Sequence, residues 1–522
     1  MVGIVHAITQ SEIEKGNAMN TYFQDSNKKR LVGTTGLRFV QFFITFGGMV
    51  CAILGTVPAA RAVPGIDGNP FGETVVAGEA SFDRATAGIL TVTTSDRAII
   101  NWQSFSIAAG NTTEFIQPGA SSAVLNRVVG GDMSSLLGTL RANGQVYLIN
   151  PNGIVVGAGA VIDTAGFVAS TLDVNNEEFM AGGDMNFVGN SEAEIVNLGR
   201  ITALHGDVVL LARHIQNDGV IEAPDGTVAL GAGREVLLVQ AGADERILVR
   251  PDTGGQTPSG TGIKQNGVIE SVRAELEASG NIYALAINHG GITRATGAQT
   301  RNGRVLLTAA GGTIDNRGTV AARKTDGTGG QIAAAARTVI NSGHLQANGT
   351  QGGEVTVQAD YVDNSGTLEA QGGVGAGGTV TVAGAVRVLQ TASGTVQAGS
   401  DGAAGGTTTL QAGTEGELGL SGAVKATGVT GGEINLLGGK VVLLGATVDV
   451  SGSEGGGNVQ IGGDPFGMET LPLSDQTLVN AASGIRADAW VNGDGGQVTL
   501  WSESLTAFQG TISVRGGASG GN

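Results

Sequence analysis

The sequence of 522 residues contains one cysteine, few aromatic residues and few charged ones. Aromatic residues make up 4% of the chain and charged residues 14%, whereas glycine contributes 90 residues. The scarcity of aromatic residues argues against compact cores built on large side chains, and the 41% hydrophobic fraction argues against disorder. A glycine-rich chain with recurring β-branched residues is typical of short strands joined by tight turns. We therefore expect an all-β protein.

The formal net charge is −17, which argues against nucleic acid as a partner because the phosphate backbone would be repelled. The single cysteine, Cys51, lies near the N-terminus in a segment that we expect to be removed. The rest of the chain then has no thiol and cannot form disulfides in an oxidising periplasm. This composition suits a protein that is exported while unfolded.

Residues 1–62 have the order of an extended secretory signal peptide. A basic cluster at Lys28-Lys29-Arg30 precedes an apolar run from Phe39 to about Val57. Ala60-Arg61-Ala62 then supplies the small residues of a cleavage site, so we predict cleavage after Ala62. The alternative is a membrane anchor, since the run is near the lower length limit for spanning. The true start is Met1 or Met19.

The strongest internal pattern is a module that returns in register. Residues 197–210 contain N-L-G-R-I-T-A and then G-D-V-V-L, and residues 217–230 repeat this as N-D-G-V-I-E-A and G-T-V-A-L. Each half alternates apolar and polar residues, as a short strand with one buried face does. Looser copies begin at residues 316, 341, 364, 393, 421 and 509. A recurring period of roughly 20–28 residues indicates a repeat architecture.

One module cannot bury its apolar faces alone, but stacked turns about 4.8 Å apart pair every strand with its counterpart in the next turn. We therefore predict a right-handed parallel β-helix in which Val, Ile, Leu and Ala form inward columns. We expect the recurring glycine to supply positive φ at the corners. We expect the recurring asparagine to adopt the left-handed region and to stack into a hydrogen-bonded ladder.

Residues 63–180 have longer apolar runs and fewer exact modules. They contain I-I-N-W-Q-S-F-S-I at 99–107, L-N-R-V at 125–128 and N-P-N-G-I at 150–154. In this order, the motifs closely resemble the N-terminal secretion domain of filamentous haemagglutinin-type exoproteins, over about residues 63–240. The resemblance implies a β-helix capped at its N-terminus. It also implies a dedicated outer-membrane barrel transporter of the two-partner-secretion (Omp85-like) class as partner.

The resemblance marks one set of candidate secretion-motif residues: Asn126, Asn150, Pro151, Asn152, Gly153 and Ile154. The Asn-Pro-Asn-Gly string is also a strong turn, because proline restricts φ and Asn-Gly favours positive φ. The alternative is therefore a corner needed for folding alone. Some family members carry an earlier N-P-N-L motif, which has no counterpart here; the nearest string is Asn69-Pro70-Phe71-Gly72. The sequence departs from the family pattern at this point, so the resemblance does not assign a subfamily.

These patterns predict an extended signal peptide over 1–62, a capped secretion domain over 63–250 and further glycine-rich β-helix over 251–522. Because the last residues fall inside a turn motif, we expect a chain truncated at its C-terminus.

No catalytic, cofactor or metal site is predicted. Acidic residues are scattered, and we expect no pair on adjacent turns with Lys or Arg between them. The histidines at 205, 214, 289 and 344 lack metal-ligand spacing and are expected on solvated outer faces. Asn111 and Asn348 begin Asn-x-Thr strings, which are weak signals for glycosylation.

The resulting hypothesis is a secreted adhesin or haemagglutinin-like protein on the surface of a Gram-negative bacterium, exported through the periplasm. Its ligand would be a receptor or glycan on a host or neighbouring cell. The alternatives are a β-helix enzyme acting on polysaccharide and the stalk of a contact-dependent toxin. Three charged side chains gathered in one groove would favour the enzyme, and a smooth acidic surface would favour the adhesin.

Overall fold

The computed structural model describes residues 67–240, 245–250, 260–279, 285–297, 303–464, 471–519 and 521. The chain divides into two units, 1–59 and 60–522, and every described residue belongs to the second. The predicted signal peptide, Cys51 and the cleavage site after Ala62 lie outside the described residues. None of the described helices is long and apolar enough to cross a membrane.

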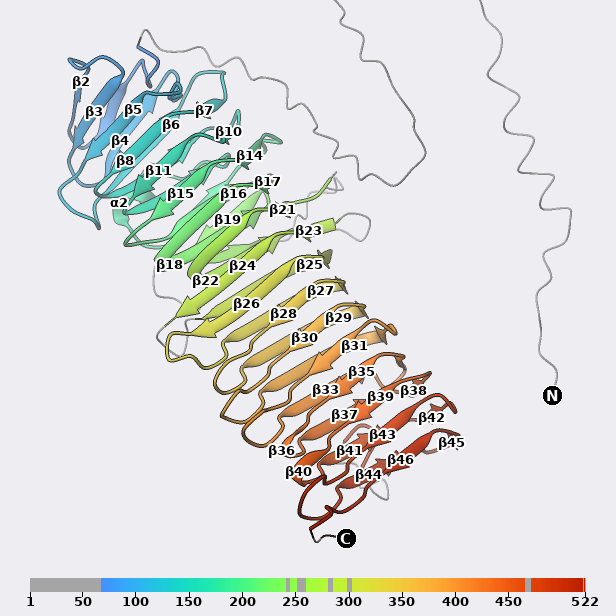
Figure 1. The fold of residues 1–522 in the computed structure, drawn as a ribbon. Helices are drawn as coiled ribbons and strands as arrows, with labels where there is room; N and C mark the ends of the chain where they lie inside the picture. Colours follow the sequence, from blue (N-terminus) through green and yellow to red (C-terminus); the bar gives the residue numbers. More distant parts are fainter. Residues whose placement is uncertain are drawn as a thin grey trace, which may run out of the picture. The chain divides into compact units, whose positions relative to one another are not determined.

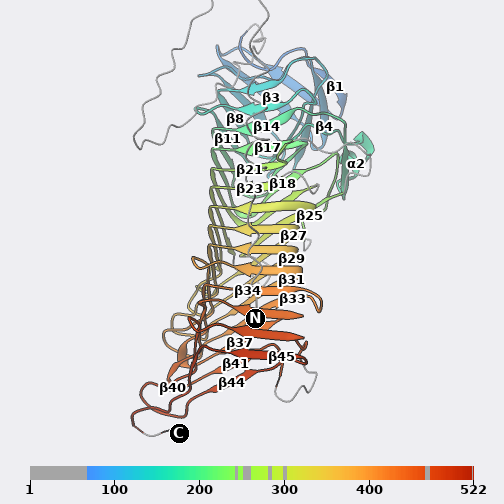
Figure 2. The same cartoon turned by 90° about the vertical axis from the view of Figure 1, so that its right-hand side faces the viewer.

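The second unit is the predicted right-handed parallel β-helix (Figure 1). Its strands stack as successive rungs, and each pairs with the equivalent strand one turn later (Figure 2). The pairings trace three columns of parallel strands, one for each face of the coil.

The first column contains β3 (Ile89–Thr94), β5 (Thr112–Ile116), β8 (Thr139–Ala142), β11 (Val161–Thr164), β15 (Arg200–Ala203), β18 (Val220–Ala232), β22 (Val268–Ala278), β24 (Ile292–Gly297), β26 (Thr319–Lys324), β28 (His344–Gln346), β30 (Thr367–Glu369), β32 (Thr395–Gln397), β35 (Ala423–Lys425), β39 (Thr447–Asp449), β43 (Gly484–Arg486) and β46 (Thr511–Ser513). The second contains β4 (Ala98–Trp102), β6 (Ala123–Val128), β9 (Gln145–Ile149), β12 (Gly166–Ser170), β16 (Val208–Ala212), the later parts of β18 and β22, β25 (Arg304–Asn316), β27 (Gln331–Asn341), β29 (Glu354–Asn364), β31 (Thr379–Gln390), β33 (Thr407–Ala412), β37 (Glu433–Leu437), β41 (Asn458–Ile461) and β44 (Gln497–Leu500). The third contains β7 (Ser134–Leu136), β10 (Ile154–Val156), β14 (Glu194–Asn197), β17 (His214–Asn217), β21 (Ile263–Gln265), β23 (Leu285–His289), the later parts of β25, β27, β29 and β31, β34 (Glu417–Leu420), β38 (Lys440–Leu443), β42 (Gln476–Val479) and β45 (Leu505–Phe508).

The N-terminal end of the coil carries the predicted cap. Two short strands, β1 (Thr74–Ala77) and β2 (Ala80–Asp83), run antiparallel to β4 and β3. Their backbone groups pair with the first rung, so this end of the coil does not present an open row of donors and acceptors. Such an edge would otherwise recruit strands from other chains.

The interior is a set of apolar columns, as the alternation predicted. The register of the 20-residue module is kept, with Ile201 opposite Ile221 and Val208 opposite Val228. All four side chains are fully buried. Since each rung adds similar residue types at the same place, burial continues from rung to rung. The last rung, formed by β44, β45 and β46, is the more exposed exception.

The predicted asparagine ladder is also present. Asn197 donates to Asn217 at 2.7 Å, Asn316 donates to Asn341 at 2.7 Å, and Asn341 donates to Asn364 at 2.8 Å. These asparagines do not adopt the left-handed region, because Arg97 is the one described non-glycine residue with positive φ. The expectation of left-handed asparagine was therefore wrong. This position instead requires a side-chain amide that can hydrogen-bond to the amide of the next rung.

The role expected for the corner glycines was wrong as well. The module glycines Gly219, Gly318 and Gly343 do not have positive φ. A Cβ atom on Gly343 would lie 2.2 Å from the carbonyl oxygen of Gly318, and one on Gly219 would lie 2.2 Å from that of Gly199. Glycine is needed here because backbones of successive rungs approach too closely for any side chain.

A feature that the sequence analysis missed is a layer outside the coil, which we call the side layer. It consists of α2 (Asn176–Ala181) and an antiparallel sheet of β13 (Met185–Val188), β19 (Glu235–Leu238) and β20 (Ile247–Val249). Figure 2 shows α2 at the side of the stacked strands. The side layer covers outward apolar residues of the second column, including Ile99, Leu125 and Val209. The longer apolar runs of the early rungs are its sequence signal, since these strands are buried on both faces.

Candidate functional site: the Asn150–Gly153 turn

The Asn-Pro-Asn-Gly string forms a tight turn between β9 and β10. The amide of Gly153 donates to the carbonyl of Asn150 at 3.1 Å, and the amide of Asn152 donates to the Asn150 side chain at 2.9 Å. Gly153 has a φ of 106°, which only glycine adopts without strain. The prediction of a strong turn with positive φ at the glycine is confirmed.

Asn150 is fully buried and fastens this turn to the preceding rung. Its side-chain nitrogen donates to the carbonyl of Asp132 at 3.0 Å and to the hydroxyl of Ser134 at 2.9 Å. Ile154 is also fully buried and begins β10. In the folded protein these two side chains hold the turn in place and are out of reach of a partner.

Pro151 is exposed and Asn152 half-buried, so the turn presents these two residues at the surface. The Asn152 side chain donates to the carbonyl of Gly130 at 2.9 Å. Beside them lies an open depression of about 580 Å³ that also contains Glu192 and Asp132. If a partner recognises the folded turn, it meets Pro151, Asn152 and this acidic rim.

Asn126 lies inside the coil, opposite Leu148 of β9, the strand that leads into the Asn150 turn. It is fully buried, and its side-chain oxygen accepts from the indole of Trp102 at 2.9 Å. The neighbouring Arg127 points outward and donates to Asp173 at 2.9 Å, next to the side layer. The I-N-W and L-N-R-V strings are thus joined by a core hydrogen bond, and Asn126 has a folding role in this structure.

Asn69-Pro70-Phe71-Gly72 forms a second turn of similar design at the cap. Asn69 is fully buried, and Gly72 has a φ of 70°. Phe71 bonds through its backbone to Ser104 at 3.0 Å, so this turn joins the cap to the first rungs. Both Asn-Pro-x-Gly strings therefore combine a buried asparagine with a left-handed glycine.

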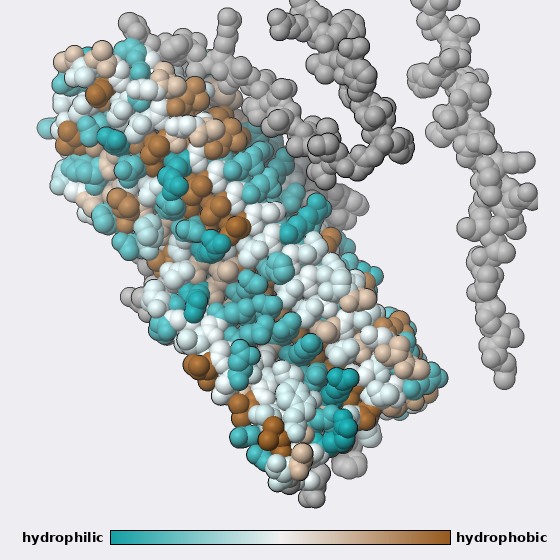
Figure 3. Space-filling model, viewed as in Figure 1, coloured by the Kyte–Doolittle hydropathy of each residue, from teal (hydrophilic) through white to brown (hydrophobic). Residues whose placement is uncertain are grey.

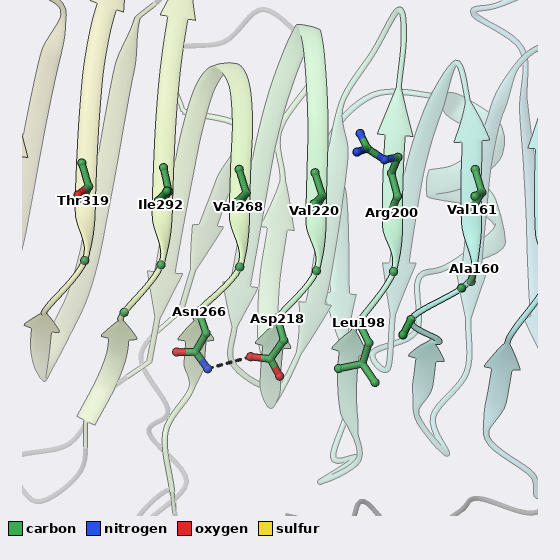
Figure 4. Close-up of a pocket in the computed structure, with 18 of the residues that line it drawn as sticks. Ala160, Val161, Leu198, Arg200, Asp218, Val220, Asn266, Val268, Ile292 and Thr319 are labelled. Carbon is green, nitrogen blue, oxygen red and sulfur yellow. Dashed lines mark hydrogen bonds between the residues drawn. The ribbon is translucent and has the colours of Figure 1, made fainter. Parts of the chain in front are cut away.

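A shallow groove of about 900 Å³ runs along the glycine corners from the rung of β11 to that of β28 (Figure 4). Val220, Val268 and Ile292 stand on one side of it, and Asp218 and Asn266 on the other, joined by a hydrogen bond of 2.8 Å. Its floor is backbone, because glycine occupies each corner. No clustered carboxylates line this groove.

The expectation that no acidic pair flanks a basic residue on adjacent turns was wrong. Glu114 on β5 lies opposite Arg141 on β8, and Arg141 lies opposite Asp163 on β11. All three line one depression of about 710 Å³. Turns of unequal length separate these residues in the sequence, so their alignment is visible only from the strand register.

The expectation of solvated histidines was wrong for His289, which is fully buried. It occupies the ladder position between Gln265 and Asn316, and its Nε2 lies 2.9 Å from the hydroxyl of Thr293. Burial lowers the pKa of His289 to about 4. Thr293 stands in an inward apolar column, and the imidazole satisfies its otherwise isolated hydroxyl.

Two carboxylates of β22 hold the outer edge of the side layer. Glu275 accepts from the amides of Arg246 at 2.7 Å and Ile247 at 3.0 Å, and Glu277 accepts from that of Val249 at 3.1 Å. Burial raises the pKa of both carboxyl groups, that of Glu277 to about 7. The edge strand β20 is thus closed by side chains in place of another strand.

No group of three or more potential metal ligands occurs within the described ranges. The two Asn-x-Thr asparagines are engaged in the fold. Asn111 donates to the carbonyl of Asp67 at 2.6 Å, and Asn348 donates to Glu369 at 2.6 Å.

Comparison with known proteins identifies this region. A family model described as a TPS secretion domain matches residues 67–322. A heme/hemopexin-binding protein of Haemophilus influenzae strain Rd is 32% identical over 263 residues, which is 48% of this chain and 28% of that protein. A second protein of that name from Haemophilus influenzae is 36% identical over 127 residues, 24% of this chain and 14% of the other. The match thus spans less than a third of the length of these relatives.

Two solved structures are also similar. The HMW1 secretion domain from Haemophilus influenzae has 24% identity and a TM-score of 0.39, with 85% of this chain and 100% of that chain covered. The filamentous hemagglutinin secretion domain has 16% identity and a TM-score of 0.32, with 60% and 95% covered. Both scores are low, so the assignment depends on the family model and the sequence relatives. The chain therefore carries, over residues 67–322, the N-terminal two-partner-secretion domain of a filamentous haemagglutinin-type exoprotein.

Proposed function

We propose that residues 67–322 direct export of this chain across the outer membrane by a barrel transporter of the Omp85-like class. The observation that carries the proposal is the Asn150 turn within a domain of the secretion family. Its buried asparagine fixes the turn, while Pro151 and Asn152 face solvent beside an acidic depression. Asn126 supports export indirectly by stabilising the early rungs.

The export test is secretion of the full chain by cells that co-express an outer-membrane transporter from the source genome. Asn152→Ala removes a surface amide that contributes about 1 kcal/mol to the fold. We expect secretion to fall several-fold with the melting temperature nearly unchanged. Asn348→Ala, which also removes a half-buried amide but lies outside 67–322, is the matched control. Unchanged secretion of a folded Asn152→Ala variant would contradict a recognition role for this residue.

We further propose that the exported chain is a surface adhesin of a Gram-negative bacterium, with the rungs after residue 322 acting as a stalk. On the face drawn in Figure 3, hydrophobic residues are scattered among hydrophilic and neutral ones. Together with the net charge of −17, this favours many weak polar contacts with a receptor or glycan. Binding of the purified chain to epithelial cells, competed by unlabelled chain, tests the proposal. Absence of saturable binding would contradict it.

Heme or hemopexin is a second candidate ligand, because both curated relatives are named for binding them. Titration of the full chain with hemin, followed by absorbance, and pull-down with hemopexin separate this candidate from adhesion. Binding of hemopexin without binding to cells would favour it over the adhesin.

A further inference from the structure

The outward face of the first column carries a line of charges that we call the acid–base ladder: Glu114, Arg141 and Asp163. They stand on consecutive strands β5, β8 and β11 in direct register. Successive charges are therefore separated by one rung, about 4.8 Å. Their signs alternate along the axis of the coil.

The acid–base ladder lies in a depression of about 710 Å³ on the secretion domain. Two apolar side chains also line it, Ile116 and Leu204, which are 45% and 46% exposed. A concave surface that combines apolar walls with a few convergent polar groups has the character of a ligand site.

The three side chains are left without partners within the fold. Among the residues that the structure describes, none of them forms an ion pair within 4 Å or a side-chain hydrogen bond. Further along the same column the charges do pair, with Arg200 against Glu222 at 2.5 Å and Arg294 against Glu270 at 2.8 Å. The three side chains of the acid–base ladder therefore lack the ion pairs that similar charges form elsewhere in the first column.

We propose that this depression binds a neutral, linear saccharide lying along the axis of the coil. An anion attracted to Arg141 would be repelled by Glu114 and Asp163. A cation attracted to these two carboxylates would be repelled by Arg141. Hydroxyl groups donate to both carboxylates and accept from the guanidinium, so a neutral polyol uses all three side chains. Ile116 and Leu204 supply apolar contact for the C–H faces of the sugar rings.

Three charged side chains in one depression are the feature that the sequence analysis expected of a polysaccharide-active enzyme, but their arrangement suits binding more than cleavage. Inverting glycosidases separate their two carboxyl groups by about 6.5–9.5 Å to admit a water and the scissile bond. Here Arg141 stands between Glu114 and Asp163 in the strand register, so a positive charge occupies the rung between the two acids. The inference rests on the proposed adhesin function and names a saccharide site for it. It is tested on purified protein, where failure of export or of binding to cells has no bearing.

The experiment is calorimetric titration of the full chain with cellohexaose, maltohexaose and laminarihexaose. We expect one of the three to bind, with Arg141→Gln and Asp163→Asn each weakening binding about tenfold or more, since a hydrogen bond to a charged group is worth about 1.5–3 kcal/mol. Arg294→Gln, in the same column but ion-paired, is the matched control and should bind as the wild type does.

Three outcomes would overturn the proposal. They are no binding of any of these hexasaccharides at millimolar concentration, equal binding by Arg141→Gln and the wild type, and tighter binding of anionic oligogalacturonate than of every neutral probe. Near-UV circular dichroism of each variant checks that the early rungs are intact.

Discussion

At the residue scale, His289 interrupts a column of buried amides with a group that can ionise. Burial lowers its pKa to about 4, below the ordinary value of 6.5. A depressed histidine pKa stabilises the fold above about pH 6.5, and this contribution is lost as the pH falls through about 4. The shift corresponds to about 3 kcal/mol at most.

We therefore expect His289→Asn to reduce the loss of stability between pH 7 and pH 4. Asparagine fits a ladder whose members at 316, 341 and 364 are already asparagine. Urea unfolding at several pH values measures the difference. His344→Asn, at an exposed histidine, serves as control, and equal pH profiles for wild type and His289→Asn would contradict the expectation.

Close backbone approach is the second residue-scale constraint. Gly343→Ala would place a methyl group 2.2 Å from the carbonyl oxygen of Gly318, so two rungs would have to separate. We expect a loss of about 1–3 kcal/mol, as for other overpacked sites. Gly119→Ala is the control, because its Cβ would have no neighbour within 4 Å. Thermal melting of both variants measures the difference. Similar melting temperatures for Gly343→Ala and Gly119→Ala would refute the close-approach argument.

At the scale of elements, the side layer depends on Glu275 and Glu277 at the edge of β20. The pKa of Glu277 is raised to about 7, first by burial and then by the nearby Glu275 and Glu245, against the Val249 amide. A carboxyl with a raised pKa stabilises the fold below about pH 4.5, and this is lost as the pH rises through about 7. The side layer should therefore loosen progressively between about pH 4.5 and pH 7.

We expect Glu277→Gln to remove most of this pH-dependent loosening, since glutamine keeps an acceptor for the Val249 amide without a charge. Hydrogen exchange of the amides of residues 247–249 between about pH 4.5 and pH 8 measures this loosening, after correction for the intrinsic exchange rate. Glu270→Gln, on the same strand but exposed, is the control. Persistence of the wild-type pH response in Glu277→Gln would rule out the carboxylate as its source.

At the scale of the whole molecule, each rung contacts its two neighbours, so the ends of the stack are where the coil could pair with another chain. Deleting residues 67–83 would remove β1 and β2 and open the first rung. We expect this variant to self-associate, because an unpaired row of backbone groups recruits other strands. Light scattering coupled to gel filtration measures it. A monodisperse monomer would show that the cap does not protect this edge.

The strand pairing continues without a break across residue 250, from β18 to β22 and on to β25. The matched secretion domain reaches residue 322. The division of the chain at residue 250 stays a prediction, as do cleavage after Ala62 and the truncated C-terminus. N-terminal sequencing of the secreted chain would test the cleavage directly, with Val63 as the expected first residue.

The sequence by itself determined the coil. The signals for the coil are local: alternating apolar residues, a recurring corner asparagine and a repeated glycine. They have the same structural consequence in every rung. They were sufficient for the fold class, for the inward columns and for the asparagine ladder. The motifs at 99–107, 125–128 and 150–154 were sufficient for the family.

The tertiary structure decided what depends on register between rungs of unequal length. It alone aligned Glu114, Arg141 and Asp163, placed His289 in the amide ladder, and laid the side layer over strands that are buried on both faces. It also showed that corner glycines serve close approach, because the atoms they would strike belong to the neighbouring rung. These features arise from contacts between residues of different rungs, and no single repeat contains them.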